Sequence, residues 1–209
     1  VGAVSLSAGS MNVGTGGSTT LNATEFASAG STTLAIATGA MVDVTQAAGV
    51  TSNFAGAMAG AGEFKFTGAD ATSMLALSNS FNASSLTLTL GGGTLSLLGG
   101  GYTFGTIHIT GNTVLDFNNS AGTFLSSAAL VIDGGVTVTV NNWISVANNT
   151  ALSTVWYATS TVNAGSLGGS DQIGGTPLSQ IVFTSYTGLT TTWVSGSHDG
   201  WFDDEIRPT

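Results

Sequence analysis

The chain has 209 residues, of which 31 are glycine and none is cysteine, and only 6% are charged. An ordinary soluble domain carries about 25% charged residues, so charged side chains are unusually scarce here. Lys65 and Arg207 are the only lysine or arginine residues. Nucleic-acid binding depends on many cationic contacts to phosphate and is therefore excluded. No apolar run approaches the ~20 residues of a membrane-spanning helix, so we also expect no membrane insertion of this chain.

The remaining composition favours an all-β fold. Hydrophobic residues make up 42% of the chain and the mean hydropathy is +0.37, which is enough apolar material for a packed core. The charged residues that fill most helices are scarce, whereas glycine and β-branched residues are abundant. Without cysteine there is neither a disulfide framework nor thiol chemistry.

Short segments of alternating apolar and polar residues follow one another along the chain and predict strands. In chain order they are 41–44, 63–67, 74–77, 86–90, 94–97, 106–110, 114–117, 130–132 and 136–140. Turn-forming glycine, asparagine and aspartate residues separate them, as at 91–93, 99–101 and 133–135.

Strands this short, starting about every ten residues, fit either a β-solenoid or a β-sandwich. We favour an all-β right-handed parallel β-helix, a β-solenoid in which each turn of about 20 or more residues contributes two or three strands. Isolated inward Leu, Val and Ile residues flanked by Thr and Ser fit that interpretation. The β-sandwich is the alternative.

We expect a single solenoid domain over residues 1–209. Residues 1–61 are rich in small side chains and are expected to form small-residue coils or an assembly arm. Residues 62–140 carry the regular coils. Residues 141–209 contain all four tryptophans, which predicts an aromatic-rich cap at the C-terminal end.

Three segments resemble known families. Residues 85–117 resemble the autotransporter-associated β-strand repeat, which is associated with right-handed β-helical passenger regions on bacterial surfaces, and 115–143 continues the resemblance. Residues 180–186, with Trp193 and 204–208, are similar to the end of the passenger in PEP-CTERM surface proteins, just before their sorting signal. The resemblance implies a secreted bacterial surface protein whose sorting tail is cleaved or not included here.

Few titratable groups are available for catalysis. A β-helical polysaccharide lyase or hydrolase needs a basic residue beside its substrate or a pair of acids in its groove. Lys65 and Arg207 are far apart in the sequence, and Asp116 and Asp133 are explained as turn residues. His108 alternates with two isoleucines, so it should face solvent. We therefore expect no catalytic residue, and no enzyme.

The C-terminal end holds the best candidate for an ion site. Four carboxylates fall within the last eleven residues, and oxygen ligands at this density can bind Ca²⁺. The candidate ligands are Asp199, Asp203, Asp204 and Glu205. A solvated acidic tail is the alternative interpretation, and no other cofactor is expected.

Aromatic and threonine residues suggest two further binding hypotheses. The aromatics of the C-terminal region form either cap packing or a platform for sugars; they are Trp143, Trp156, Tyr157, Trp193 and Trp201. Outward threonines could form a flat ice-binding face; the candidates are Thr87 with Thr89, Thr137 with Thr139, and the threonines at 190–192.

The N-terminal segment shows no obvious cap, and its residues Val1, Val4 and Leu6 are candidates for assembly by strand addition. A head-to-tail contact that does not close produces a filament. The leading hypothesis is therefore a non-catalytic structural protein, secreted to a bacterial cell surface or extracellular matrix, that assembles with itself into a fibre or surface layer. The alternative is a monomeric adhesin module that binds a polysaccharide through the C-terminal aromatics.

Overall fold

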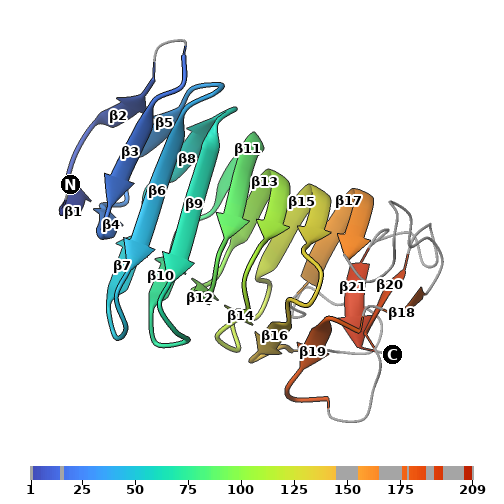
Figure 1. The fold of residues 1–209 in the computed structure, drawn as a ribbon. Helices are drawn as coiled ribbons and strands as arrows, with labels where there is room; N and C mark the ends of the chain where they lie inside the picture. The colour runs from blue at the N-terminus through green and yellow to red at the C-terminus, as the bar shows by residue number, and fades with distance from the viewer. Residues whose placement is uncertain are drawn as a thin grey trace.

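The computed structural model describes residues 2–14, 17–144, 155–164, 176–177, 179–186, 191–194 and 205–208. These residues form strands and turns and contain no helix. The strands stack turn upon turn along one axis, with the two ends of the chain at opposite ends of the molecule (Figure 1). The chain is a parallel β-solenoid of about six turns, so the predicted solenoid is confirmed and the sandwich is not observed.

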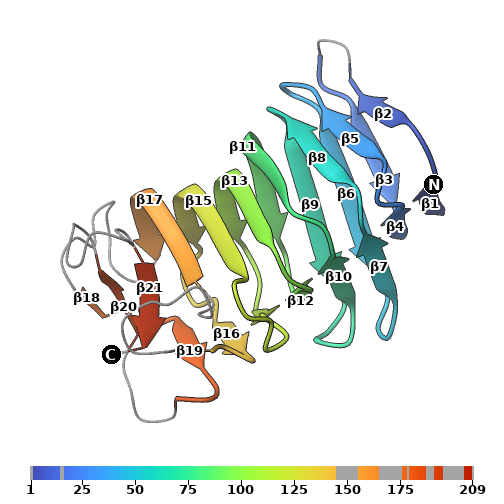
Figure 2. The same ribbon diagram turned by 180° about the vertical axis from the view of Figure 1, so that it is seen from behind.

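Three sheets form the walls of this solenoid, which Figure 2 shows from behind. Sheet A runs in the order β1 (Ala3–Leu6), β4 (Glu25–Ser28), β7 (Thr51–Phe54), β10 (Met74–Leu77), β12 (Gly93–Leu97), β14 (Thr113–Asp116), β16 (Val138–Asn141) and β19 (Ile181–Phe183). Sheet B consists of β2 (Ser10–Val13), β5 (Thr33–Ile36) and β8 (Ala57–Gly60). Sheet C runs in the order β3 (Thr20–Ala23), β6 (Met41–Gln46), β9 (Glu63–Gly68), β11 (Phe81–Leu90), β13 (Gly101–Ile109), β15 (Phe124–Ile132), β17 (Val155–Ala164), β21 (Glu205–Pro208), β20 (Thr191–Val194) and β18 (Thr176–Pro177).

The number of strands in a turn changes along the solenoid. Each of the first three turns gives one strand to sheet A, one to sheet B and one to sheet C. From β11 onward one long strand takes the place of the separate strands of sheets B and C. This is seen from β11, which contacts both β8 of sheet B and β9 of sheet C. Its pairing with β13 shifts between Ala83 and Thr87, which marks the bend within the long strand.

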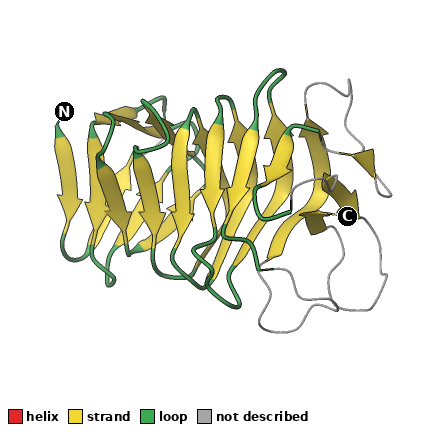
Figure 3. Ribbon diagram, turned by 90° about the horizontal axis from the view of Figure 1, so that it is seen from below, coloured by secondary structure: helices red, strands yellow, loops and turns green. Residues whose placement is uncertain are grey.

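The core is a continuous column of inward side chains. It lies inside the stacked turns, whose ribbon is seen from below in Figure 3. In sheet A, Leu75 pairs with Leu95 and Leu95 with Leu115, so that identical side chains stack from turn to turn. Aromatic rings continue the column, since the Phe54 ring centroid lies 6.0 Å from that of Phe26 and 6.4 Å from that of Phe81. Every turn thus buries its apolar side chains against the next turn.

The N-terminal segment 1–61 contains β1 to β8 and belongs to the same stack. Its strands are therefore coils of the solenoid, and a role of this segment in assembly stays a prediction. Some of its inward positions hold only alanine, as at Ala23 and Ala40, which are 4% and 2% exposed.

Asparagine residues form some of the corners beside sheet A. Asn118 and Asn142 both adopt a φ of 54°, in the left-handed region that asparagine tolerates better than most residues. The Asn142 side-chain amide donates to Asp116 Oδ1 at 2.7 Å, and that of Asn118 donates to Ser96 Oγ at 2.6 Å. The corners of neighbouring turns are therefore hydrogen-bonded to each other.

Parallel stacking in sheet C ends at β17, where β21, β20 and β18 continue the sheet in antiparallel order. Two predicted cap aromatics are buried near this end: Trp156 is fully buried, and Trp143 is 5% exposed. The Trp143 ring lies edge-on between Phe117 and Phe183, with centroids 5.0 Å from each.

Candidate functional site

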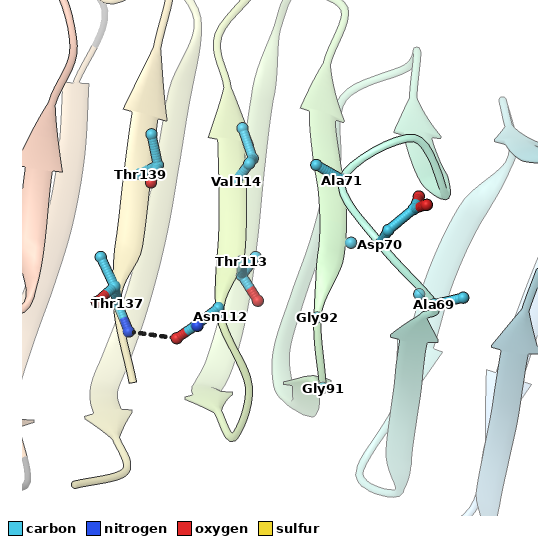
Figure 4. A pocket seen from close by; sticks show the side chains of 12 residues that line it. Ala69, Asp70, Ala71, Gly91, Gly92, Asn112, Thr113, Val114, Thr137 and Thr139 are labelled. Carbon is cyan, nitrogen blue, oxygen red and sulfur yellow. Dashed lines mark hydrogen bonds between the residues drawn. The ribbon is translucent and has the colours of Figure 1, made fainter. Parts of the chain in front are cut away.

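A shallow groove of about 500 Å³ follows the corner between sheet C and sheet A (Figure 4). It is lined by the corner segments of four successive turns, at 68–71, 91–93, 112–114 and at residues 137 and 139. Successive turns are stacked about 4.8 Å apart along the solenoid axis. Because the groove is lined by the same corner of each turn, it runs along that axis.

The chemistry of this groove is nearly neutral, because Asp70 is the one charged residue in its lining. The Asp70 carboxylate accepts hydrogen bonds from the Thr72 hydroxyl at 2.6 Å and the Thr72 N–H at 2.8 Å. These bonds hold the pKa of Asp70 below its usual value. Figure 4 shows the carboxylate pointing away from Gly91 and Gly92. The lining therefore offers no pair of groups for acid and base catalysis.

The glycines in the groove are explained by packing. Gly93 has a φ of +81°, and a Cβ there would lie 2.8 Å from the Ser73 carbonyl oxygen and 2.9 Å from the Phe66 ring. The Asn112 side chain accepts a hydrogen bond from the Thr137 N–H at 2.8 Å, which ties two turns together (Figure 4). The groove is therefore a consequence of the corner structure, and its lining residues pack and hydrogen-bond within that corner.

A second hollow, of about 380 Å³, lies where the chain passes from sheet A to the first half of the long strands. Phe124 stands in its wall with 38% of its surface exposed. Sequence reasoning missed this residue because it sought binding aromatics in the C-terminal region. A signal was present: the expected alternation allows only one of the adjacent residues Phe124 and Leu125 to face the core, and Leu125 is the buried one.

His108 and the two acids considered for catalysis do not form one site. His108 lies on the outer face of β13, as expected, and its Nε2 lies 2.9 Å from Asp133 Oδ1 in an exposed pair. Asp116 ends a strand of sheet A, whereas Asp133 follows a strand of sheet C. Asp116 accepts from the Asn118 N–H at 2.8 Å, which makes it a turn residue.

Lys65 forms an ion pair with a neighbouring strand of sheet C. Its ammonium group lies 3.0 Å from Asp43 Oδ2, and the two residues are direct partners on β9 and β6. The Asp43 side chain is only 18% exposed, so the pair neutralises a carboxylate that is largely removed from water.

Most of the proposed calcium ligands lie outside the described residues, namely Asp199, Asp203 and Asp204. Glu205 begins β21, where it pairs with Tyr157 and Val194. Within the described ranges, no three His, Asp or Glu residues come together in a way that could hold a metal ion. A search of the same residues finds no helix with the length and hydropathy to cross a membrane.

The predicted aromatics fall into three groups. Trp143 and Trp156 are buried in the core, where they cannot stack on a sugar. Tyr157 lies in β17 and Trp193 in β20, where Trp193 pairs with the first residue of β18. Trp201 lies outside the described residues.

The threonines considered for ice binding do not share a face. Thr87 and Thr89 belong to β11 in sheet C, whereas Thr139 belongs to β16 in sheet A and Thr137 lies just before it. Thr191 and Thr192 belong to β20, among the antiparallel strands of sheet C, and Thr190 lies outside the described residues. On sheet C, Thr89 pairs with Lys65 and His108. Charged and titratable side chains therefore interrupt the threonines there.

The assembly residues lie at the N-terminal end of the solenoid. Val4 and Leu6 alternate with exposed residues on β1 and are half-buried, whereas Val1 lies outside the described residues. Met11 on β2 and Leu21 on β3 are half-buried in the same way and pack against the core. Sequence reasoning missed Met11 and Leu21, although each alternates with polar residues just as Val4 does.

Comparisons with known proteins do not assign the chain to a family. No protein-family model matches it, and neither a curated protein nor a solved structure does so. The resemblance of 85–117 to the autotransporter-associated repeat stays a prediction.

Proposed function

We propose that this protein is a non-catalytic structural protein that associates with copies of itself, end to end, through its first turn. One observation carries the proposal: in the described residues, β1, β2 and β3 each pair with a strand of the second turn and with none on the other side. Unpaired N–H and C=O groups along a strand edge are a template for another strand.

This edge lacks the features that normally prevent strand addition. Proteins protect their edges with charged side chains, especially lysine, or with proline. Residues 1–24 contain no charged residue and no proline. Val4, Met11 and Leu21 extend the core to this end and are only partly covered. A second turn placed on them buries the rest of their apolar surface, which stabilises the contact by about 25 cal/mol per Å².

A second copy of this chain suits the edge because it carries parallel strands at the same spacing. Sheet A ends at β19, whose paired strand is β16. On its other side, the Ile181 carbonyl oxygen accepts from the Thr191 hydroxyl of β20 at 2.7 Å and the Phe183 carbonyl oxygen from the Tyr186 N–H at 3.2 Å. Sheet C ends differently, in antiparallel strands. In the proposed contact, β1 of one copy lies beside β19 of the next, whose two outward carbonyl oxygens can each accept a second hydrogen bond. Such a contact does not close on itself, and repetition produces a fibre.

The proposed location is outside the cell, on a bacterial surface or in its matrix. The resemblance of 85–117 to the autotransporter-associated repeat supports this location. The absence of cysteine and the low charge are compatible with it.

Substitution of Ser5 tests the contact without disturbing the first turn. The carbonyl groups of Gly2 and Leu6 accept hydrogen bonds from Thr24 and Ala29 of the second turn, at 3.2 and 2.9 Å. Amide directions alternate along a strand, so the Ser5 N–H points to the open side. Ser5→Pro removes this donor and keeps the existing bonds. We expect the parent chain to form concentration-dependent rods in sedimentation and negative-stain microscopy, and Ser5→Pro to remain monomeric.

A matched pair on β3 separates burial from charge. Leu21 faces the core at the open end, and Thr20 beside it is exposed. Leu21→Glu should abolish association because it places a charge in the contact, whereas Thr20→Glu should retain it. Melting temperatures establish that each variant is folded. A parent chain that is monomeric at all concentrations, or that forms only a closed dimer, would contradict the proposal, and so would association that survives both Ser5→Pro and Leu21→Glu.

A further inference from the structure

The hollow beside Phe124 combines an exposed aromatic ring with uncharged polar groups. Its lining comes from three neighbouring turns and consists of Ser80, Phe81, Asn82, Gly101, Thr103 and Phe124. The strand register explains the arrangement. Phe124 pairs with Gly101, and two residues further along β13, on the same face, Thr103 pairs with Asn82. An aromatic residue thus lies diagonally across the sheet from an amide and a hydroxyl.

A glycine gives the Phe124 ring its position. A Cβ on Gly101 would lie 2.0 to 2.8 Å from the outer atoms of the ring, so the ring occupies the space that any other side chain would fill. The Gly101 N–H donates to Ser80 Oγ at 2.9 Å, which holds the strand below the ring. The ring therefore rests on the backbone of β13, and 38% of its surface remains exposed.

The polar groups around the ring can donate and accept hydrogen bonds. Asn82 is exposed, and its Oδ1 accepts from the Ser84 N–H at 3.1 Å, which fixes the amide orientation. Its NH₂ group and the hydroxyl of the half-buried Thr103 are the further groups that can bond to a ligand. No charged residue lines the hollow.

We propose that this hollow is a subsite for one residue of a neutral polysaccharide. A pyranose ring has an apolar face of C–H groups that packs against an aromatic ring, and hydroxyl groups at its rim that bond to amides and hydroxyls. A charged ligand finds no counter-ion here, and a purely apolar ligand would leave the Asn82 and Thr103 groups without partners. The ring is already held in place, so little conformational freedom is lost on binding. The site lies on the fourth to sixth turns, away from the first turn, and does not depend on the proposed association.

Titration with neutral oligosaccharides tests the subsite. Cellohexaose, maltohexaose and mannohexaose are added to protein with ¹³C-labelled phenylalanine rings, and NMR follows the Phe124 ring signal. We expect a saturable shift with at least one of them and a weaker effect with hexagalacturonate. Phe124→Ala lacks the reporter ring, so its affinity is measured beside that of the parent by isothermal titration calorimetry, and should be about tenfold weaker. Thr103→Val keeps the side-chain shape and removes the hydroxyl, and should weaken binding by about fivefold.

Leu98→Ala is the matched control, because Leu98 is 47% exposed and does not line the hollow. It should leave the affinity unchanged, and melting temperatures establish that every variant is folded. The absence of any Phe124 shift at millimolar concentrations of all three neutral sugars would overturn the proposal. So would an equal loss of affinity in Leu98→Ala, or tighter binding of hexagalacturonate than of the neutral probes.

Discussion

Tyr102 shows how one polar group is accommodated inside the solenoid. Its side chain is fully buried, and its ring packs edge-on against Phe81 with centroids 5.6 Å apart. The hydroxyl lies 2.7 Å from the carbonyl oxygens of Leu77 and Gly99 and donates to one of them at a time. Burial raises the pKa of Tyr102 to about 12, because the phenolate would lose its hydration.

This pKa predicts that the fold loses stability in alkali. Above pH 10 the tyrosine ionises in the unfolded chain, while the folded chain keeps the proton up to about pH 12. The unfolded state then binds fewer protons, so the free energy of unfolding falls as the pH rises through this window. Urea titrations at several pH values should show this fall in the parent chain and a smaller one in Tyr102→Phe. Equal slopes in both proteins would contradict the assignment to Tyr102.

Tyr102→Phe should also lower the free energy of unfolding near neutral pH by about 1 kcal/mol, because the substitution removes one hydrogen bond from the interior.

At the scale of the element, close approach of strands decides where glycine is needed. Gly60 ends β8 with a φ of +99°, and a Cβ there would lie 2.0 Å from the Ile36 carbonyl oxygen on β5. The obstacle is backbone, which cannot rotate away as a side chain can. Gly9 has a similar φ of +73° but no atom within 4 Å of the Cβ position.

These two glycines form a matched pair for a stability measurement. Gly9→Ala should lower the free energy of unfolding by about 1 kcal/mol, the usual penalty of a left-handed backbone with a side chain. Gly60→Ala should lower it by about 3 kcal/mol or more, because strands β5 and β8 must also move apart. Denaturant unfolding of both variants measures the difference. Equal losses would show that backbone conformation alone accounts for Gly60.

The strands differ in how well the sequence predicted them. All nine predicted segments coincide, to within two residues at their ends, with all or part of an observed strand, namely β6 and β9 to β16, because alternating large aliphatic residues mark them clearly. The strands β17 to β21 were missed, and so were β1 to β5, β7 and β8. Their inward residues include alanine, as in Ala23, and even serine, as in Ser52, which is fully buried and accepts the Phe26 N–H at 2.9 Å. Small inward residues weaken the periodicity on which prediction depends.

At the scale of the whole molecule, charge and proposed assembly are coupled. The formal net charge is -9, yet residues 1–24 carry none of the charged side chains. Two copies therefore repel each other through the rest of the chain, while the proposed contact itself is apolar and hydrogen-bonded.

This distribution predicts that salt promotes association. Raising the ionic strength from about 0.01 to 0.15 M shortens the Debye length from about 30 to about 8 Å and screens the repulsion between copies. Sedimentation should show more association at the higher salt, and also as the pH is lowered toward the pI of about 4.1. Association that weakens with added salt would indicate a contact made by charge pairs and would contradict the proposed apolar edge.

The sequence by itself determined the fold class, the scarcity of charged side chains and the outward direction of His108, because periodicity and composition can be read from the chain without its contacts. It did not determine which strands share a sheet. Paired residues such as Leu75 and Leu95 are one turn apart in the sequence, and the length of each turn is not evident from local patterns. Only the tertiary structure decided that Trp143 and Trp156 are buried and that Phe124 rests on Gly101 at the surface. The exposure of an aromatic residue depends on what the neighbouring turns place around it, and that is a property of the stack.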